Sequence, residues 1–583
     1  MIRKLARSIR QYKRDTILTP LSMTLEVIME VLLPIIMADL IDNGISAGNS
    51  AVIWRDGLLL AGVSILSLLS GLLGGVFGAR ASSGFARNLR HDMYYRLQDY
   101  SFSNIDKFST SSLITRLTTD VSNVQNAFQM LIRMAARSPL MLIFSGIMAF
   151  RVNARLALIF LCVVPFLAVG LTYVATHAHP VFRKVFKTYD SLNNVVQENV
   201  RGMRVVKSFV REDYEDKKFE DISGQVCTLF TKAERIIALN SPLMQFAMYA
   251  CTLLISWFGA KFILSSVGQP NAMTTGELNS LLTYSMQILG SLMMLSFMFV
   301  MLTISRASGE RICEVLDEQS DLHSPENART EISDGSVDFD GVSFSYAGNK
   351  KRLCLEDVNL HIHSGKTIGI VGGTGSSKST LVQLIPRLYD ATEGVVKVGG
   401  HDVKEYDLEA LRNSVAMVLQ KNVLFSGTIR ENLRWGNPDA TDEELVAACR
   451  LAQAHEFIEG FPQGYDTFIE QGGSNVSGGQ KQRLCIARAI LKKPKILILD
   501  DSTSAVDTRT DALIREGMKK IIPGTTTFII AQRVSSVMDA DKIIVLDGGR
   551  VNGFGTHDEL MQTNEIYREV YTSQTKGGGD YDE

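Results

Sequence analysis

Apolar residues gather in six long runs in the first half of the chain, whereas the second half mixes short apolar stretches with amphipathic ones. The six runs lie at about 17–40, 58–77, 130–150, 156–174, 243–264 and 281–304. Each is close to the roughly 20 residues that an α-helix needs to cross a bilayer. The pattern therefore predicts an all-α transmembrane domain of six helices within residues 1–306.

Charge predicts how these helices are oriented. Lys and Arg number six before the first run, six in 78–127 and eleven in 175–242, against three in the alternate connections together. By the positive-inside rule, both termini and the two long connections are expected in the cytoplasm. These connections have helical patterning, which predicts extensions reaching roughly 35–50 Å beyond the membrane. The sequence thus indicates a multi-pass protein of the lipid bilayer.

A glycine-rich turn in the second half joins the apolar run 367–371 to the amphipathic run 381–388. It fits the pattern G-x-x-x-x-G-K-[ST], with Ser377 in place of the second glycine. In such a loop the backbone N–H groups surround nucleotide phosphates, the lysine reaches the β- and γ-phosphates, and the hydroxyl ligates Mg²⁺. The predicted nucleotide-binding residues here are Gly372, Gly373, Thr374, Gly375, Ser376, Ser377, Lys378, Ser379 and Thr380.

Later segments carry further candidates for the same site. Asp500 and Asp501 end the apolar run 496–499, where an acid that holds Mg²⁺ belongs. Gln420 follows the apolar run 415–419, and Tyr346 precedes the loop, where its ring is able to stack on a base. Ser477, Gly478, Gly479 and Gln480 form an anion-binding helix start. Ser379, Gln420 and Asp500 are the expected Mg²⁺ ligands.

These pieces, in this order, resemble the ATP-binding cassette (ABC) ATPase domain, and the resemblance covers residues 336–570. It implies an α/β P-loop NTPase fold with ATP and Mg²⁺ as cofactors. Together with the six spans, the layout resembles an exporter half-transporter, with residues 307–335 as linker and 571–583 as a flexible tail. The segments 108–119 and 199–207 resemble those that bear the family's coupling helices.

In this family two ATPase domains close head to tail, so each ATP lies between one domain's phosphate loop and the other's SGGQ segment. The family pattern has Glu where this chain has Asp501, and His where it has Gln532. A carboxylate one methylene short is misplaced by roughly 1 Å, which can cost about 10²-fold in rate. Gln532 donates hydrogen bonds, but unlike histidine it cannot take up a further proton or carry a positive charge. The two degenerate catalytic positions, Asp501 and Gln532, therefore predict weak hydrolysis at this chain's own phosphate loop. Gln420, the third catalytic candidate, keeps the family pattern.

The SGGQ segment of residues 477–480 follows the pattern in full, and Asp507 fits the loop that crosses between the two sites. The resemblance thus implies the degenerate-site subunit of a bacterial heterodimeric multidrug exporter in the plasma membrane. Its partner is expected to be a second half-transporter with the catalytic Glu and His. The alternatives are a lipid or peptide exporter subunit, an active homodimeric exporter, and an ATP-binding regulatory subunit that transports nothing.

Two groups of residues bear on the cargo. Glu26 and Glu30 share one helix face within the first run, and an acid at that depth tends to face a wet cavity. The alternatives are solvation near one interface, or pairing with Arg133 or Arg137. On the last run Met294 and Met298 share a face, which suits either ordinary packing or varied apolar ligands. If both groups face the cargo, it is lipophilic and cationic.

Composition excludes other functions. The net charge is −2, and the sequence has no basic patch with interleaved aromatic residues, so no nucleic-acid partner is expected. The seven cysteines are scattered without a C-x-x-C pair, which argues against a cysteine metal site.

Overall fold

The computed structural model describes residues 1–265, 273–348, 350, 352–501, 508–521 and 524–576. The chain forms two compact units. The helical unit comprises residues 1–98 and 109–318, and the α/β unit comprises residues 99–108 and 319–583. The two units agree in kind and order with the predicted all-α and α/β domains.

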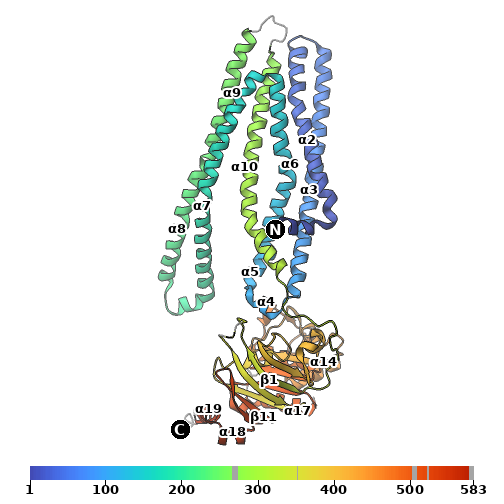
Figure 1. Ribbon diagram of the computed structural model, residues 1–583, viewed down its shortest axis with the longest axis vertical. Helices are drawn as coiled ribbons and strands as arrows, with labels where there is room; N and C mark the ends of the chain where they lie inside the picture. The colour runs from blue at the N-terminus through green and yellow to red at the C-terminus, as the bar shows by residue number, and fades with distance from the viewer. Residues whose placement is uncertain (266–272, 349, 351, 502–507, 522–523, 577–583) are drawn as a thin grey trace. The chain divides into compact units, whose positions relative to one another are not determined.

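The helical unit consists of long helices joined by short turns (Figure 1). Its helices are α1 (Ile2–Leu5), α2 (Lys13–Asp39), α3 (Ser50–Gln98), α5 (Thr110–Thr115), α6 (Val121–Val152), α7 (Ala154–Ser208), α8 (Glu212–Ala238), α9 (Asn240–Ser265) and α10 (Thr275–Asp317). A 3₁₀ segment, η1 (Ala6–Tyr12), and two π turns, η2 (Leu40–Ile45) and η3 (Arg116–Asp120), connect some of them. Among the described residues, six helical stretches are long and apolar enough to cross a membrane, which confirms the predicted number.

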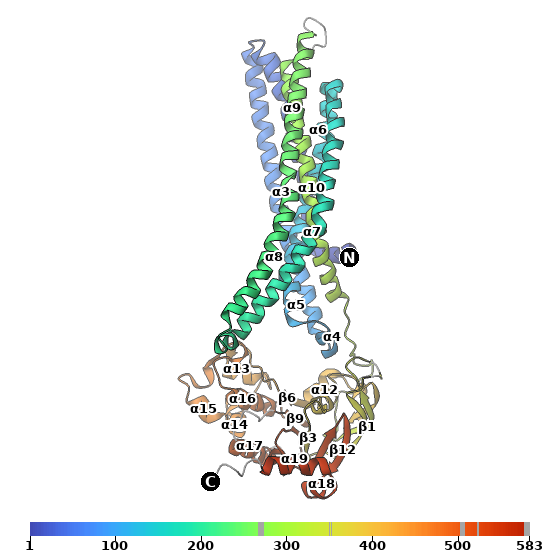
Figure 2. The ribbon, with the colours of Figure 1, turned by 90° about the vertical axis from the view of Figure 1, so that its left-hand side faces the viewer.

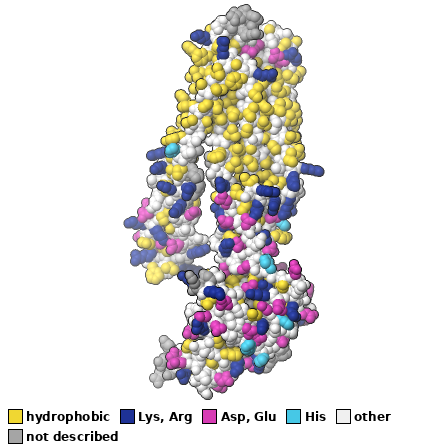
Figure 3. All heavy atoms as spheres, viewed as in Figure 1, with side chains coloured by type: hydrophobic (Ala, Val, Ile, Leu, Met, Phe, Trp, Pro, Cys, Tyr) yellow, Lys and Arg dark blue, Asp and Glu magenta, His cyan; other side chains and the backbone are white. Residues whose placement is uncertain are grey.

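Hydrophobic side chains cover a broad band on the outside of the helical unit, and Lys and Arg gather beyond its lower edge (Figure 3). Leu58, Leu68, Leu253 and Trp257 are each more than two thirds exposed. Such a surface is unfavourable in water but suits contact with lipid tails. Helices α7 and α8 lie side by side and continue past this band as a two-helix extension, as the sequence predicted for one of the long connections (Figure 2).

Helix α10 is longer than the last apolar run predicts. The sequence placed a linker from residue 307, but α10 continues without a break to Asp317. Ile312 and Val315, one helical turn apart, are fully buried in this part of the helix. The polar composition of this stretch therefore reflects an amphipathic helix, and the irregular segment between the units begins at residue 318.

The α/β unit contains two main sheets. Its strands are β1 (Val337–Phe344), β2 (Leu355–Ile362), β3 (Thr367–Gly372), β4 (Glu393–Val398), β5 (His401–Asp402), β6 (Val415–Val418), β7 (Gly427–Thr428), β8 (Phe468–Ile469), β9 (Ile496–Asp500), β10 (Thr526–Ile530), β11 (Lys542–Asp547) and β12 (Arg550–Gly555). The six-stranded sheet has the order β12-β11-β3-β10-β9-β6 and is parallel except for β12. The four-stranded antiparallel sheet has the order β2-β1-β4-β5.

Helices of the α/β unit cover the parallel sheet and form a lobe beside it (Figure 2). They are α11 (Lys378–Gln383), α12 (Leu408–Ser414), α13 (Ile429–Arg434), α14 (Asp442–Leu451), α15 (His455–Glu459), α16 (Gly478–Leu491), α17 (Thr508–Ile521), α18 (His557–Thr563) and α19 (Glu565–Lys576), with single 3₁₀ turns η4 (Val403–Glu405), η5 (Gly464–Asp466), η6 (Gln471–Gly473) and η7 (Val534–Ser536). A further short helix, α4 (Phe102–Lys107), belongs to the unit but comes from the N-terminal half of the chain. All five residues of β9 are buried, as expected for an inner parallel strand. One core packs α16 against this sheet, and another fills the space between the two sheets.

The C-terminal part differs from the prediction of a flexible tail from residue 571. Helix α19 continues to Lys576. Gln574 Nε2 donates to the carbonyl of Gln532 at 2.9 Å, and Gln574 Oε1 accepts from the N–H of Val534 at 2.8 Å. These bonds fix the end of the helix to the loop after β10.

Candidate functional site

The predicted site residues come together at one edge of the parallel sheet. β3, β10, β9 and β6 are neighbours and run in the same direction, so their carboxyl ends meet. The phosphate loop of residues 372–380 follows β3, and Asp500 ends β9. Gln532 follows β10, and Gln420 follows β6. Ligand sites of open α/β sheets lie at this kind of edge.

The phosphate loop is wound tightly around its lysine. Lys378 Nζ donates to the carbonyls of Gly372 and Gly373, each at 2.8 Å. A Cβ on Gly372 would lie 2.2 Å from the carbonyl oxygen of Leu546, so only glycine fits there. Burial lowers the pKa of Lys378, and the nearby Asp500 and Asp501 oppose that effect. The loop therefore holds a cationic group at its centre.

Ser377 occupies the position where the loop pattern has glycine, and its backbone is left-handed, with φ 69° and ψ 27°. A residue with a Cβ adopts this conformation only at a cost in free energy. Ser377 precedes α11, whose first residues are Lys378 and Ser379. Serine in place of glycine at position 377 therefore adds backbone strain to the loop, which still leads directly into α11.

Asp500 is buried beside the phosphate loop. Ser379 Oγ donates to Asp500 Oδ1 at 3.0 Å. Burial raises the pKa of Asp500; the Ser379 bond lowers it, the Asp501 charge raises it further, and Lys378 lowers it. A buried carboxylate paired with a hydroxyl in this way is stabilised by a divalent cation that takes both oxygens as ligands.

The two residues that depart from the family's catalytic pattern are bonded to each other. Gln532 Nε2 donates to Asp501 Oδ2 at 2.6 Å, and Gln420 Nε2 makes a longer contact of 3.5 Å with the same oxygen. Asp501 is 8% exposed, and its backbone N–H donates to the carbonyl of Ile530 at 3.1 Å. The carboxylate is thus directed at two amide groups within the sheet edge.

Tyr346 lies at the same end of the unit, half exposed. Its hydroxyl is 3.0 Å from Thr380 Oγ1 and donates to Gln383 Oε1 at 3.3 Å, and both of these residues belong to α11. Its ring packs edge-on against Tyr389, with centroids 5.2 Å apart. The exposed part of the ring is available to stack on a base next to the phosphate loop.

The SGGQ segment forms the start of α16. Ser477 Oγ accepts from the N–H of Gln480 at 3.3 Å, and Gln480 Oε1 accepts from the N–H of Ser477 at 2.9 Å. This reciprocal capping box fixes the first turn of the helix and occupies the N–H groups of Ser477 and Gln480, while Ser477 and Gly478 are exposed. The segment is thus arranged to donate backbone hydrogen bonds to an anion from outside the unit. Asp507 lies outside the described residues.

The donor set fits ATP with Mg²⁺. A Cβ built on Gly373 or Gly375 would contact nothing within 4 Å, so the loop presents its backbone to open space. Lys378 supplies a cation for the phosphates, and the carboxylate–hydroxyl pair of Asp500 and Ser379 supplies the oxygens that Mg²⁺ prefers. Gln420 adds an amide oxygen at the same edge. The cofactors predicted from the sequence are thus compatible with the residues present.

The two acids of the first span are paired. Arg137 Nη2 on α6 lies 2.8 Å from Glu30 Oε1 and 3.4 Å from Glu26 Oε1, both on α2. Gln287 Nε2 donates to the carbonyl of Glu30, which has no helical donor because Pro34 lacks an N–H. Of the alternatives left open by the sequence, pairing with Arg137 is the one that the structure contains.

The two methionines predicted to contact the cargo lie on α10. Met294 and Met298 are half-buried on α10. Their neighbour on the same helix face, Ser291, donates to the carbonyl of Gln287 at 2.6 Å. Gln287 in turn accepts from Ser145 on α6. This face is therefore partly used for helix packing, and contact of the two methionines with cargo stays a prediction.

Sequence reasoning missed two positions near the site. Gln574 fixes the backbone of Gln532 from a region assigned to the tail, and Tyr389 packs against Tyr346. A polar residue in the last helix gives no local signal of its distant partner. The segment joined to the α/β unit is 99–108, which overlaps the resemblance at 108–119 only at its first residue.

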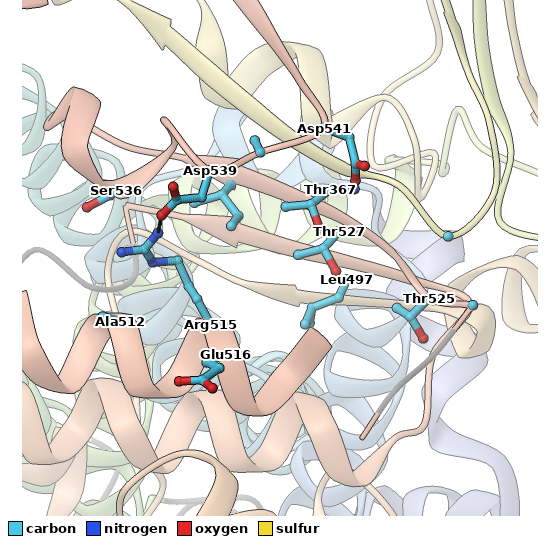
Figure 4. A pocket seen from close by; sticks show the side chains of 14 residues that line it. Thr367, Leu497, Ala512, Arg515, Glu516, Thr525, Thr527, Ser536, Asp539 and Asp541 are labelled. Carbon is cyan, nitrogen blue, oxygen red and sulfur yellow. Dashed lines mark hydrogen bonds and ion pairs between the residues drawn. The ribbon is translucent and has the colours of Figure 1, made fainter. Parts of the chain in front are cut away.

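A pocket of about 560 Å³ lies at the opposite edge of the parallel sheet, where β3, β9 and β10 begin (Figure 4). Arg515 of α17 points across it toward Asp539, 3.7 Å away, and also approaches Asp511 at 3.3 Å. Of the predicted site residues that the structure describes, none lines this pocket.

Comparison with known proteins identifies both units. The family model of the ABC transporter transmembrane region matches residues 16–292, and that of the ABC transporter matches residues 355–504. The chain is 37% identical to YfiB of Bacillus subtilis (strain 168), described as an uncharacterized ABC transporter ATP-binding protein, over 95% of each chain.

A second relative and a solved structure extend the likeness. YgaD of the same organism, a putative multidrug export ATP-binding/permease protein, is 31% identical over 97% of this chain and 98% of its own. The structure of a bacterial Atm1-family ABC exporter with ATP bound has a TM-score of 0.80 and 25% identity, over 97% of this chain and 98% of that one.

Proposed function

Because this chain belongs to the ABC transporter family, as an exporter half-transporter with one ATPase domain, we propose that it is the degenerate-site subunit of a heterodimeric exporter. In this proposal the subunit binds ATP at its own phosphate loop but hydrolyses it poorly. It supplies Ser477–Gln480 to a partner chain, and the partner's catalytic Glu and His perform most of the hydrolysis.

The hydrogen bond between Gln532 and Asp501 carries this proposal. In a competent site the acid polarises the attacking water, and the histidine contacts the γ-phosphate. Here the shorter acid is bonded at 2.6 Å to an amide that neither takes up a proton nor carries charge. Because the two residues that depart from the catalytic pattern form a hydrogen bond with each other, they support a joint loss of hydrolytic function at this site.

The remaining residues keep their binding roles in the proposal. The backbone of residues 372–377 and the Lys378 ammonium hold the phosphates, and Tyr346 packs against the base. Ser379, Asp500 and Gln420 hold Mg²⁺, which neutralises charge on the β- and γ-phosphates when bound. Asp501 and Gln532 keep each other oriented, so neither activates a water. ATP therefore stays bound at this site for longer and keeps the two ATPase domains associated.

The proposed cargo is a small lipophilic compound, because the relative YgaD is described as a putative multidrug exporter. Arg137 pairs with Glu30 and Glu26, but one guanidinium balances only one of the two carboxylates, so a cationic charge on the cargo stays part of the proposal. Lipid and peptide export stay as alternatives within transport. We place the subunit in the bacterial plasma membrane, with both termini in the cytoplasm, from the charge distribution of its connections.

The test repairs the site in the chain purified alone. The double variant Asp501→Glu with Gln532→His has a competent phosphate loop and its own intact SGGQ segment, so its ATPase rate should rise on the order of 10²-fold over the wild type. The same repair combined with Lys378→Ala is the control and should stay silent. A wild-type rate equal to that of the repaired chain would support the active homodimer instead. A repair that raises the ATPase rate of the partnered complex without changing transport would support the regulatory subunit.

A further inference from the structure

Gln574, near the end of α19, bonds to the backbone of the loop that carries Gln532. Its Nε2 donates to the carbonyl of Gln532 at 2.9 Å, and its Oε1 accepts from the N–H of Val534 at 2.8 Å. A side-chain amide offers both a donor and an acceptor, as a peptide group does. The two bonds hold the peptide groups on either side of Arg533, so they fix the course of the backbone just after β10, which ends at Ile530.

The position of Gln574 is set by the packing of α19. Tyr567 of this helix is 1% exposed and belongs to the core that packs against the parallel sheet. Its hydroxyl lies 2.8 Å from Nδ1 of His557 on α18, and Tyr571 packs against the same core. Tyr567, Tyr571 and Gln574 follow the spacing i, i+4, i+7, which places them on one face of the helix. Gln574 is therefore carried by a helix that is firmly packed on the α/β unit.

The side chain of Gln532 extends from this backbone into the site. Its Nε2 donates to Asp501 Oδ2 at 2.6 Å. The NH₂ group has two protons, so a second one is left for a phosphate oxygen. In the family pattern, the residue at this position contacts the γ-phosphate. Because the rotamers of a side chain depend on its backbone, a displaced loop would carry the amide away from both the acid and the phosphate.

We propose that Gln574 is a positioning residue that holds the Gln532 amide against the γ-phosphate of bound ATP. The inference rests on the proposed function only in that ATP binds here with its γ-phosphate beside residue 532. Since both bonds of Gln574 are made to the backbone, they hold whichever side chain stands at position 532. Helix α19 thus takes part in distinguishing ATP from ADP, which lacks the γ-phosphate.

A purely structural role of Gln574 is the competing explanation. If its bonds only fasten α19, their loss lowers the unfolding midpoint but leaves the relative affinity for ATP and ADP unchanged. If the bonds position Gln532, their loss weakens the binding of ATP and spares that of ADP. The ADP affinity is unaffected because Gln574 bonds the loop after β10 and not the phosphate loop.

The test is equilibrium binding of Mg²⁺ with a non-hydrolysable ATP analogue, and of Mg²⁺–ADP, to the full chain in lipid nanodiscs. Gln574→Met keeps an unbranched side chain of similar length and removes both bonds. It should lower the ratio of ATP-analogue affinity to ADP affinity about fivefold, the factor expected for one lost hydrogen bond. Tyr567→Phe is the matched control and should leave this ratio unchanged, because it removes a bond that fixes the same helix away from the loop.

A double-variant comparison shows whether Gln574 acts through Gln532. Gln532→Ala should lower the same affinity ratio about fivefold. Because both variants lose the same contact with the γ-phosphate, Gln574→Met in the Gln532→Ala chain should lower the ratio no further. Two independent effects would instead add in free energy.

Four results would overturn the inference: an unchanged ratio in Gln574→Met, an equal fall in Tyr567→Phe, no fall in Gln532→Ala, or additive effects of Gln574→Met and Gln532→Ala. Binding of neither nucleotide by the wild type would refute both the inference and the proposed function. A competent hydrolysis rate in the wild type would refute the degenerate site but leave the affinity ratios, and thus the inference, intact.

Discussion

Ser377 carries a backbone strain that a single substitution is expected to relieve. Its φ of 69° lies in the left-handed region, where an L-residue with a Cβ pays roughly 1 kcal/mol or more. Ser377→Gly should therefore stabilise the protein by about 1 kcal/mol, seen as a higher midpoint of thermal unfolding. Ser376→Gly is the control, because Ser376 is buried and its φ lies outside that region. The control should lower the midpoint, and equal shifts of both variants would contradict the strain.

Asp500 destabilises the protein at neutral pH in the absence of Mg²⁺. Burial raises its pKa, so the folded state binds a proton more tightly than the unfolded state. Folding stability therefore falls as the pH rises through the raised pKa. Asp500→Asn removes the charge but keeps an oxygen for the Ser379 hydroxyl, and should raise the unfolding midpoint at neutral pH.

This difference between Asp500→Asn and the wild type should shrink as the pH falls through the raised pKa, because the wild-type carboxyl then becomes neutral. Added Mg²⁺–ATP should stabilise the wild type and leave the variant little changed. A variant less stable than the wild type at neutral pH would show that the carboxylate is satisfied within the fold.

Among the elements, α19 is the one whose importance is least visible in the sequence. Gln574 makes two bonds to the backbone around Gln532, each worth about 1 kcal/mol. A chain ending at residue 576 should unfold at the wild-type midpoint, whereas one ending at residue 571 should lose about 2 kcal/mol. The measurement is thermal unfolding of the two truncated chains. Equal unfolding midpoints would support the original prediction that residues from 571 onward form a flexible tail.

The contact between α2 and α6 includes ion pairs between Arg137 on α6 and two acids on α2. Arg137→Met would leave Glu26 and Glu30 without the cation that now lies within 3.4 Å of each. Because the three side chains are only partly exposed, removing the cation leaves two carboxylates close together without a counter-charge, so the folded yield in detergent should fall. The triple variant with Glu26→Gln and Glu30→Gln should recover most of that loss. Tolerance of Arg137→Met alone would instead indicate that the acids face water.

At the scale of the whole molecule, the sequence predicts those features that depend on local pattern. The six spans follow from the length of each apolar run, and the edge that gathers Asp500, Gln420 and Gln532 follows from motifs at strand ends. The pairing of Arg137 was one of several alternatives, because periodicity gives the face of a helix but not its neighbour. The bonds of Gln574 and Tyr389 join residues far apart in the chain, and no local pattern encodes such partners.

The asymmetry between this chain and its partner is the central claim, and the ATPase rate of the chain purified alone and then with its half-transporter partner tests it most directly. The account predicts near-silence alone and turnover on pairing, with that turnover lost when Ser477→Arg blocks the SGGQ segment of this chain. Rapid turnover by the chain alone would contradict the account, because it would mean that Asp501 and Gln532 form a competent site and that the exporter is a homodimer.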